Sequence, residues 1–132
     1  MTPTEADTLL REIAEKRGYT LRMHRILAEA DPTFLRSYED LLDAAYIRSR
    51  SLDRRTKELI YIAVLTAVSA PREQLVAHME AAVATGAEPL EILEVLEQAL
   101  PPVGVPRFIE GLEAWAALFA DGLRDGVRGT RC

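Results

Sequence analysis

The chain has 132 residues, of which 48% are hydrophobic and 28% charged, with a formal net charge of −5. This length and balance are typical of one soluble globular domain, predicted over residues 1–132, that can fold without disulfides or a metal. Lysines and arginines are dispersed among acids, so we expect no nucleic-acid partner. The single cysteine, Cys132, excludes an intrachain disulfide. Its role stays open, and a reducing, cytoplasmic setting is expected.

Helical periodicity accounts for nearly all of the chain, and no segment alternates with period two, so we predict an all-α fold. A first helix is expected at 4–17 and a second at about 20–30. A third should begin at Asp31 and Pro32, which suit a helix cap and a first turn. Its apolar residues form one inward-facing stripe, at Phe34, Leu35, Tyr38, Leu41, Leu42, Ala45 and Tyr46.

Four further helices are expected in the rest of the chain, at about 54–68, 71–86, 89–100 and 107–119. Residues 101–106, "PPVGVP", are expected to form a loop, because proline lacks the N–H that a helix needs. Residues 122–132 are rich in glycine and charge, and we expect this tail to fray.

The helix predicted at 54–68 is apolar on nearly all sides. Its run from Leu59 to Ala70 is shorter than the roughly 20 residues that span a bilayer, so we predict a buried helix and no membrane partner. The N-terminal segment carries acids and no apolar stretch, so we expect no signal peptide. A helix apolar all round must be covered all round, which indicates a central helix, an oligomer interface, or both.

His78 interrupts an apolar face in "REQLVAHMEAAV", residues 72–83. At helical spacing this face also holds Leu75, Met79, Ala82 and Val83. A lone histidine in such a place is more often a core residue bonded to a carbonyl or carboxylate. A half-buried imidazole can also serve as a general acid or as a donor to a developing enolate.

Glu58 is the acid of the most apolar helix, and two readings of it stand side by side. It can favour the helix dipole and pair with Arg54 or Arg55. It can also point into a site, where it would orient His78 or relay a proton. Tyr61, one turn further on, is expected in the core or at the wall of the same pocket.

An anionic substrate needs a cation, and two arginines are candidates for that contact. Arg72 precedes the face that carries His78, and Arg107 follows the proline-rich segment. A guanidinium can hold a carboxylate through two hydrogen bonds, although either residue could instead be a solvated surface group. No phosphate-binding loop, metal-spaced cluster or Ser-His-Asp signature occurs, so we expect no cofactor and no metal.

Three segments follow one another in a recognisable order: "LDRRTKELIYIAVLTAV", "REQLVAHMEAAVATGAEPLEILEVLEQAL" and "PPVGVP". This order resembles the carboxymuconolactone decarboxylase family of the alkylhydroperoxidase D-like superfamily, over about residues 33–117. The resemblance implies an all-α bundle of six to seven helices. It also implies that small subunits assemble into a homo-oligomer, a trimer or a hexamer.

The superfamily divides by its chemistry. One branch carries a C-x-x-C before the histidine and acts as a thiol peroxidase or disulfide reductase. The other has no cysteines and decarboxylates a lactone acid without a cofactor. Here Pro71 and Gln74 stand at the two cysteine positions before His78, so the chain resembles the second branch and not a thiol peroxidase.

The resemblance implies a cofactor-independent decarboxylase-type lyase acting on a small carboxylated lactone or keto acid, as in aromatic catabolism. His78 and Glu58 would be catalytic. Arg72, Arg107 and Tyr61 would bind the substrate carboxylate and its surroundings. The alternative is a non-catalytic oligomeric scaffold or small-ligand binding protein of the same fold. The Pro101-Pro102 pair favours it, because decarboxylases typically carry a tyrosine in that stretch.

Overall fold

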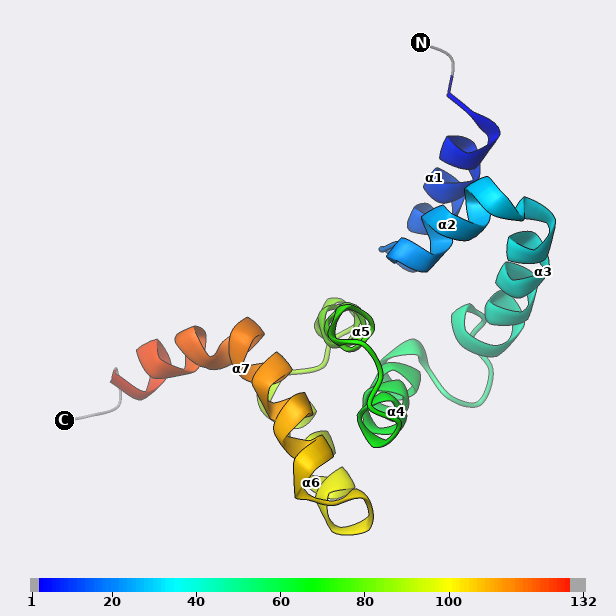
Figure 1. Ribbon diagram of the computed structural model, residues 1–132. Helices are drawn as coiled ribbons and strands as arrows, with labels where there is room; N and C mark the ends of the chain where they lie inside the picture. Colours follow the sequence, from blue (N-terminus) through cyan, green and yellow to red (C-terminus); the bar gives the residue numbers. More distant parts are fainter. Residues whose placement is uncertain (1–2, 129–132) are drawn as a thin grey trace. The chain divides into compact units, whose positions relative to one another are not determined.

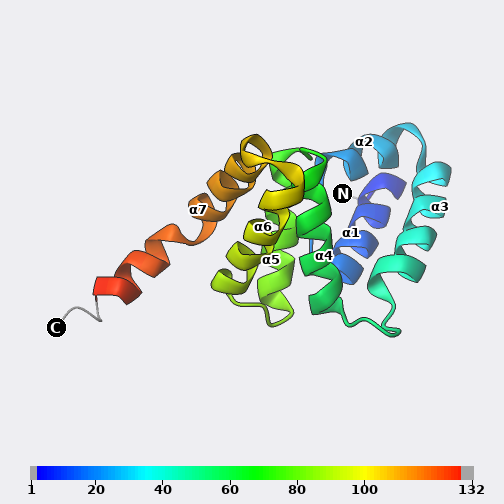
Figure 2. The same ribbon diagram turned by 90° about the horizontal axis from the view of Figure 1, so that it is seen from below.

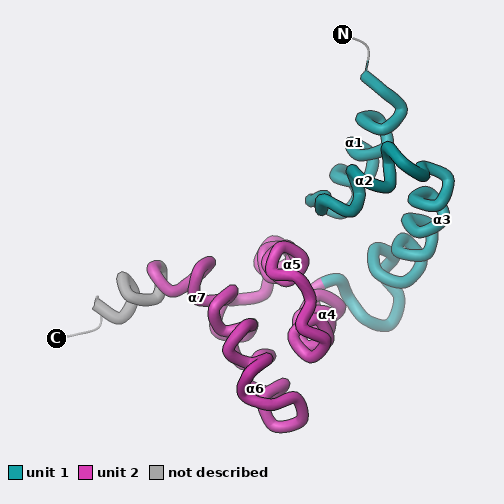
Figure 3. The backbone as a smooth tube through the Cα atoms, viewed as in Figure 1, with its two compact units in different colours: residues 1–54 teal, residues 55–132 magenta. Residues whose placement is uncertain are grey.

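The computed structural model describes residues 3–128, and this part of the chain contains helices and no strand (Figure 1). The all-α prediction is confirmed. The elements are α1 (Glu5–Arg17), α2 (Arg22–Ala30), α3 (Pro32–Leu42), the π-helical η1 (Asp43–Ile47), α4 (Arg54–Ala67), α5 (Arg72–Ala84), α6 (Pro89–Val103) and α7 (Val105–Arg128). Where the length suggested one domain, contacts divide the chain into two compact units, residues 1–54 and 55–132 (Figure 3).

The first unit is built from α1, α2 and α3 around a small apolar core. That core consists of Leu9, Leu10, Ile13, Ala28 and Leu35. Thr4 and Asp7 cap α1 reciprocally, since the Asp7 N–H donates to Thr4 Oγ1 at 3.1 Å. Hydrogen bonds from the Thr4 side chain, and then from its backbone, hold the pKa of Asp7 below its ordinary value.

The apolar stripe predicted for the third helix is wrong in part. Phe34 and Leu41 are 57% and 61% exposed, whereas Leu35 and Tyr46 are fully buried. The stripe is wider than the face of α3 that meets the core, so that of this helix Leu35 is buried in the core and Tyr38 packs against it only in part. Tyr46 lies in η1, where the wider turn changes which side chains point inward.

Three charged or titratable side chains join the helices of the first unit. Arg17 of α1 holds Glu39 of α3 through its Nε at 3.1 Å and its Nη2 at 2.5 Å. His24 of α2 is fully buried, and its Nδ1 accepts the Leu21 N–H at 2.8 Å. The proton of a neutral imidazole therefore lies on Nε2, which is 3.5 Å from Glu39 Oε1 without hydrogen-bond geometry. These contacts hold the three helices together.

The second unit carries the larger core. In Figure 2, α4, α5 and α6 lie side by side, and α7 contacts both α5 and α6. The core residues are Ile62, Leu75, Met79, Ala82, Ala87, Ile92, Leu96, Ala114 and Trp115. The Trp115 Nε1–H donates to the Pro89 carbonyl at 2.8 Å, which satisfies the one polar atom of this large buried ring.

The loop predicted at residues 101–106 is wrong. α6 continues through Val103 with Pro101 and Pro102 inside it, and α7 begins at Val105. Proline has a helical φ, and each of these two prolines removes only one hydrogen bond to a carbonyl four residues earlier, so the cost is confined to the last turn of α6. The break between the helices is therefore a single residue, Gly104, whose φ of 105° suits glycine. At its other end α7 continues through Arg128, beyond the start of the expected frayed tail, and residues 129–132 lie outside the described part.

The turn after α4 contains a strained residue. Ser69 has a φ of 53°, the only positive φ among the described non-glycine residues. Its N–H donates to the Thr66 carbonyl, and the Ala70 N–H donates to the Leu65 carbonyl at 3.0 Å. This hydrogen-bond pattern ends a helix with a left-handed residue, a position that glycine usually occupies.

Replacing Ser69 with glycine is expected to stabilise the protein by about 0.5–1 kcal/mol, because relief of the left-handed strain exceeds the added entropy of the unfolded chain. Urea unfolding at fixed protein concentration measures this change. Ser51→Gly is the matched control, since Ser51 is exposed and has no positive φ. A lower unfolding midpoint for Ser69→Gly than for the parent chain would contradict the prediction.

Candidate functional site

Glu58 and His78 meet in the interior of the second unit. α4 supplies Glu58, which is fully buried, and α5 supplies His78, which is 4% exposed. The His78 Nδ1 lies 2.7 Å from Glu58 Oε2. The predicted contact between these two residues is confirmed. Their catalytic role remains a prediction.

The geometry shows which ring nitrogen of His78 contacts Glu58. Nδ1 is the nitrogen that faces the Glu58 carboxyl group, and a ring protonated on Nδ1 donates a hydrogen bond to it. This contact fixes the orientation of the His78 ring relative to α4. Tyr61 of α4 lies beside this ring, with the two centroids 5.2 Å apart and the planes inclined by 59°.

The alternative pairing of Glu58 with Arg55 is wrong. Arg55 forms an ion pair with Glu91 of α6. The Arg54 Nη2 donates to the Tyr46 hydroxyl at 2.9 Å.

Of the neighbouring apolar residues expected to share the inward face with His78, Leu75 and Met79 are buried. Val83 is 40% exposed, because it lies in the last turn of α5 at the edge of the core.

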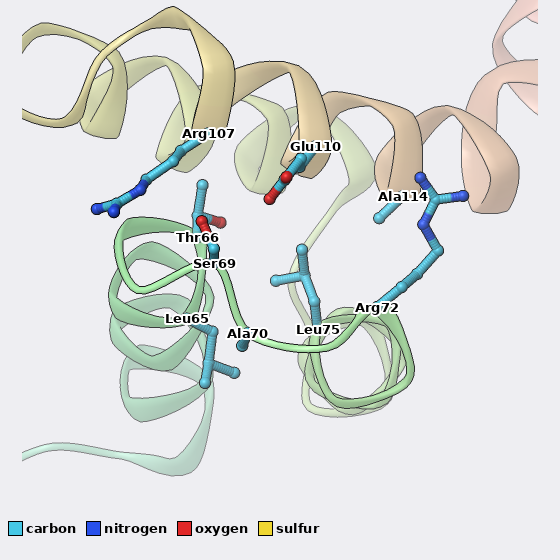
Figure 4. A pocket seen from close by; sticks show the side chains of 10 residues that line it. Leu65, Thr66, Ser69, Ala70, Arg72, Leu75, Arg107, Glu110 and Ala114 are labelled. Atoms are coloured by element: carbon cyan, nitrogen blue, oxygen red, sulfur yellow. The ribbon is translucent and has the colours of Figure 1, made fainter.

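A separate hollow of about 330 Å³ lies where α7 crosses the turn between α4 and α5 (Figure 4). Both predicted substrate-binding arginines, Arg72 and Arg107, line it, together with Glu110. Arg107 also has a structural contact, since its Nη1 donates to the Ala67 carbonyl at the end of α4. The other residues that line the hollow are Leu65, Thr66, Ser69, Ala70, Leu75, Gly111 and Ala114.

The hollow and the Glu58–His78 pair are neighbours along the same two helices. None of Glu58, Tyr61 and His78 lines the hollow, but Leu65 follows Tyr61 by four residues and Leu75 precedes His78 by three. One helical turn, about 5.4 Å, therefore separates them along each helix. The structure brings Arg72 and Arg107 to one place and Glu58, Tyr61 and His78 to another.

Sequence reasoning did not single out Glu110 or Ser69, which also line the hollow. Glu110 follows Arg107 by three residues and so shares its helix face, a signal that the helical spacing contains. Ser69 had no such signal, because its position depends on the left-handed turn that follows α4.

No helix in the described part of the chain is both long and apolar enough to cross a membrane. Within that same part, no three histidine, cysteine, aspartate or glutamate side chains gather as ligands for a metal ion.

An all-α bundle with a buried histidine–glutamate pair on consecutive helices, and no cysteine before the histidine, is consistent with an alkylhydroperoxidase D-like bundle. The model of the carboxymuconolactone decarboxylase family matches residues 32–117, and the chain belongs to that family. Neither a curated protein nor a solved structure matches the chain. The matched range begins at α3, so α1 and α2 precede it.

Proposed function

We propose that the protein is a cofactor-independent decarboxylase-type lyase that acts on a small carboxylated lactone or keto acid. The observation that carries this proposal is the 2.7 Å contact between His78 Nδ1 and Glu58 Oε2 in a buried place. Membership of the carboxymuconolactone decarboxylase family supports the same class of reaction. A role in aromatic catabolism follows from this proposal.

The reaction needs one proton and a place for one electron pair. When the bond between the carbon skeleton and the carboxylate breaks, carbon dioxide leaves and the electron pair forms an enolate. Protonated His78 gives its Nε2 proton to the enolate carbon and returns to the neutral ring, while the Nδ1 proton stays on the ring and is donated in a hydrogen bond to Glu58. Protonation of Nε2 from solvent restores the starting state. The low exposure of both residues supports the exclusion of water from this step.

The other predicted residues would position the substrate. Tyr61 lies against the His78 ring and would line the space beside Nε2. Arg72 and Arg107 would hold a substrate carboxylate in the hollow one helical turn away, where a guanidinium can form paired hydrogen bonds. Of the two, Arg72 is the stronger candidate, because Arg107 already donates to Ala67.

The test is release of carbon dioxide above the uncatalysed background, measured with carboxylated lactones and β-keto acids and no added cofactor. His78→Asn is expected to lower kcat by about 10²–10⁴-fold, the usual contribution of a positioned general acid. Glu80→Gln, an exposed change on the same helix, is the control and should leave the rate unchanged. Release by the parent chain at the uncatalysed background would favour the non-catalytic binding protein, and equal rates above background for the parent chain and His78→Asn would exclude His78 as the proton donor.

We further propose that the protein works as a homo-oligomer, a trimer or hexamer. Three apolar side chains recur at intervals of four along one face of α4 and into the turn after it: Ile60, Val64 and Val68, which are 44%, 53% and 63% exposed. An exposed apolar stripe on an otherwise apolar helix is typical of an interface. The family resemblance implies the same assembly.

A charge in this stripe should break the assembly. Val64→Lys is expected to shift the mass measured by light scattering to that of a single chain, since a buried unpaired ammonium opposes association. Leu90→Lys, at an equally exposed apolar residue of α6, is the control and should leave the mass unchanged. A folded single chain for the unaltered protein at micromolar concentration would refute the proposal.

A further inference from the structure

Three charged side chains line the hollow: Arg107 is held by the Ala67 carbonyl, and the other two, Arg72 and Glu110, have opposite charges and form no ion pair with each other. Arg72 begins α5, and Glu110 lies on α7. Both line the hollow, and neither side chain forms a hydrogen bond or ion pair within the described part of the chain. Figure 4 shows the Glu110 carboxylate directed from α7 into the space between the end of α4 and the start of α5, and Arg72 extending beside Ala114. The hollow thus offers a cationic and an anionic group at separate places.

A polar side chain also lines the hollow at a strained position. Ser69 keeps a left-handed φ of 53°, where glycine would cost less free energy. Its hydroxyl forms no hydrogen bond within the described residues, so it does not serve the fold. Strained backbone positions concentrate at ligand sites, where the side chain itself is needed. The Thr66 hydroxyl, by contrast, donates to the Ile62 carbonyl at 2.8 Å.

We infer that this hollow binds a small molecule with one carboxylate and one hydrogen-bond donor, an ammonium or a hydroxyl, and that Glu110 rejects a second carboxylate. Arg72 binds the carboxylate of the ligand, and Glu110 accepts a hydrogen bond from the ligand's ammonium or hydroxyl group. Leu65, Leu75 and Ala114 contact the carbon skeleton. The inference deepens the proposed function by naming a substrate class, and it rests on that function only in treating the hollow as part of the substrate site.

The physical reason is charge complementarity combined with repulsion. An ammonium group of the ligand near Glu110 forms an ion pair with the carboxylate, and a hydroxyl group forms a hydrogen bond with it. A second ligand carboxylate is repelled there, because Glu110 carries the same charge. Arg72 and Glu110 are exposed, so solvent screens both effects and each is expected to change affinity by roughly three- to fivefold. Discrimination of this size is within reach of a direct binding measurement.

Three probes of the same chain length separate these effects: 4-aminobutanoate, butanoate and butanedioate. Their dissociation constants are measured with the whole protein by ligand-observed nuclear magnetic resonance at constant ionic strength, since salt screens exposed charges. We expect 4-aminobutanoate to bind tightest, butanoate about three- to fivefold more weakly, and butanedioate weakest.

Variants assign the discrimination to the two residues. Glu110→Gln should bring the three dissociation constants to within about twofold of one another, because it removes the charge and keeps the size. Arg72→Gln should weaken all three probes. Glu113→Gln, an exposed change on α7 that does not line the hollow, is the control and should keep the order of the parent chain. Circular dichroism checks that each variant is folded.

Several results would overturn the inference: tightest binding of butanedioate, unchanged discrimination in Glu110→Gln, unchanged binding in Arg72→Gln, or no binding of any probe. These results are distinct from failure of the proposed function. That failure would leave probe binding and discrimination intact while no carbon dioxide is released from the lactone and keto acids.

Discussion

Replacing His78 with alanine is expected to destabilise the protein by about 3–5 kcal/mol, because it takes the imidazole away from a fully buried carboxylate. Urea unfolding at fixed protein concentration measures the change, since assembly would make the unfolding midpoint depend on concentration. His78→Asn, which keeps a polar side chain next to Glu58, should cost less. A loss below about 1 kcal/mol for the alanine variant would show that the pair is not coupled to folding.

A double-mutant cycle separates the pair from the loss of packing. Glu58→Gln removes the charge, and combining it with His78→Ala should cost 0.5–3 kcal/mol less than the sum of the two single changes. Leu75→Ala provides the matched comparison, because Leu75 is buried one turn earlier on α5. Its cost should add to that of Glu58→Gln. Equal additivity for His78 and Leu75 would contradict a specific Glu58–His78 interaction.

Replacing Gly111 with valine is expected to destabilise the protein by about 3 kcal/mol, because the neighbours of α7 leave no room for a side chain at this glycine. A Cβ there would lie 2.9 Å from Leu96 Cδ2 and 3.2 Å from Thr66 Cγ2. Both neighbours are buried, so neither can move aside freely. Ala117→Val, at an exposed position of the same helix, should cost only a few tenths of a kcal/mol from helix propensity. Thermal or urea unfolding measures both changes.

Shortening the Leu96 side chain should relieve the clash that Gly111→Val creates. Leu96→Ala alone should cost about 2–5 kcal/mol through its cavity. Together with Gly111→Val, the total should be smaller than the sum, since the new side chain occupies part of that cavity. Strict additivity of the two changes would mean that the helices separate at Gly111 instead of keeping their contact.

Much of the candidate site followed from residue types that are unusual for their place. His78 on an apolar face and Glu58 on an apolar helix each need a partner, and the simplest partner for each is the other. Arg72 and Arg107, which both line the hollow, were predicted as cations that could bind a substrate carboxylate. Glu110 was missed, although its spacing from Arg107 placed it on the same helix face. The strain at Ser69 could not be predicted, because serine alone does not indicate a left-handed turn.

The sequence by itself determined the helices, most of their ends, the absence of a cysteine before His78, and the family. These properties depend on hydrogen bonds and periodicity within a few residues, which local composition controls. Only the tertiary structure decided that Glu58 faces His78 while Arg55 pairs with Glu91. It also decided that Pro101 and Pro102 extend α6 and that Arg72 and Glu110 border one hollow. The contacts of Glu58 with His78 and of Arg55 with Glu91 join segments far apart in the chain. The packing of whole helices selects these partners from several that the local pattern allows equally.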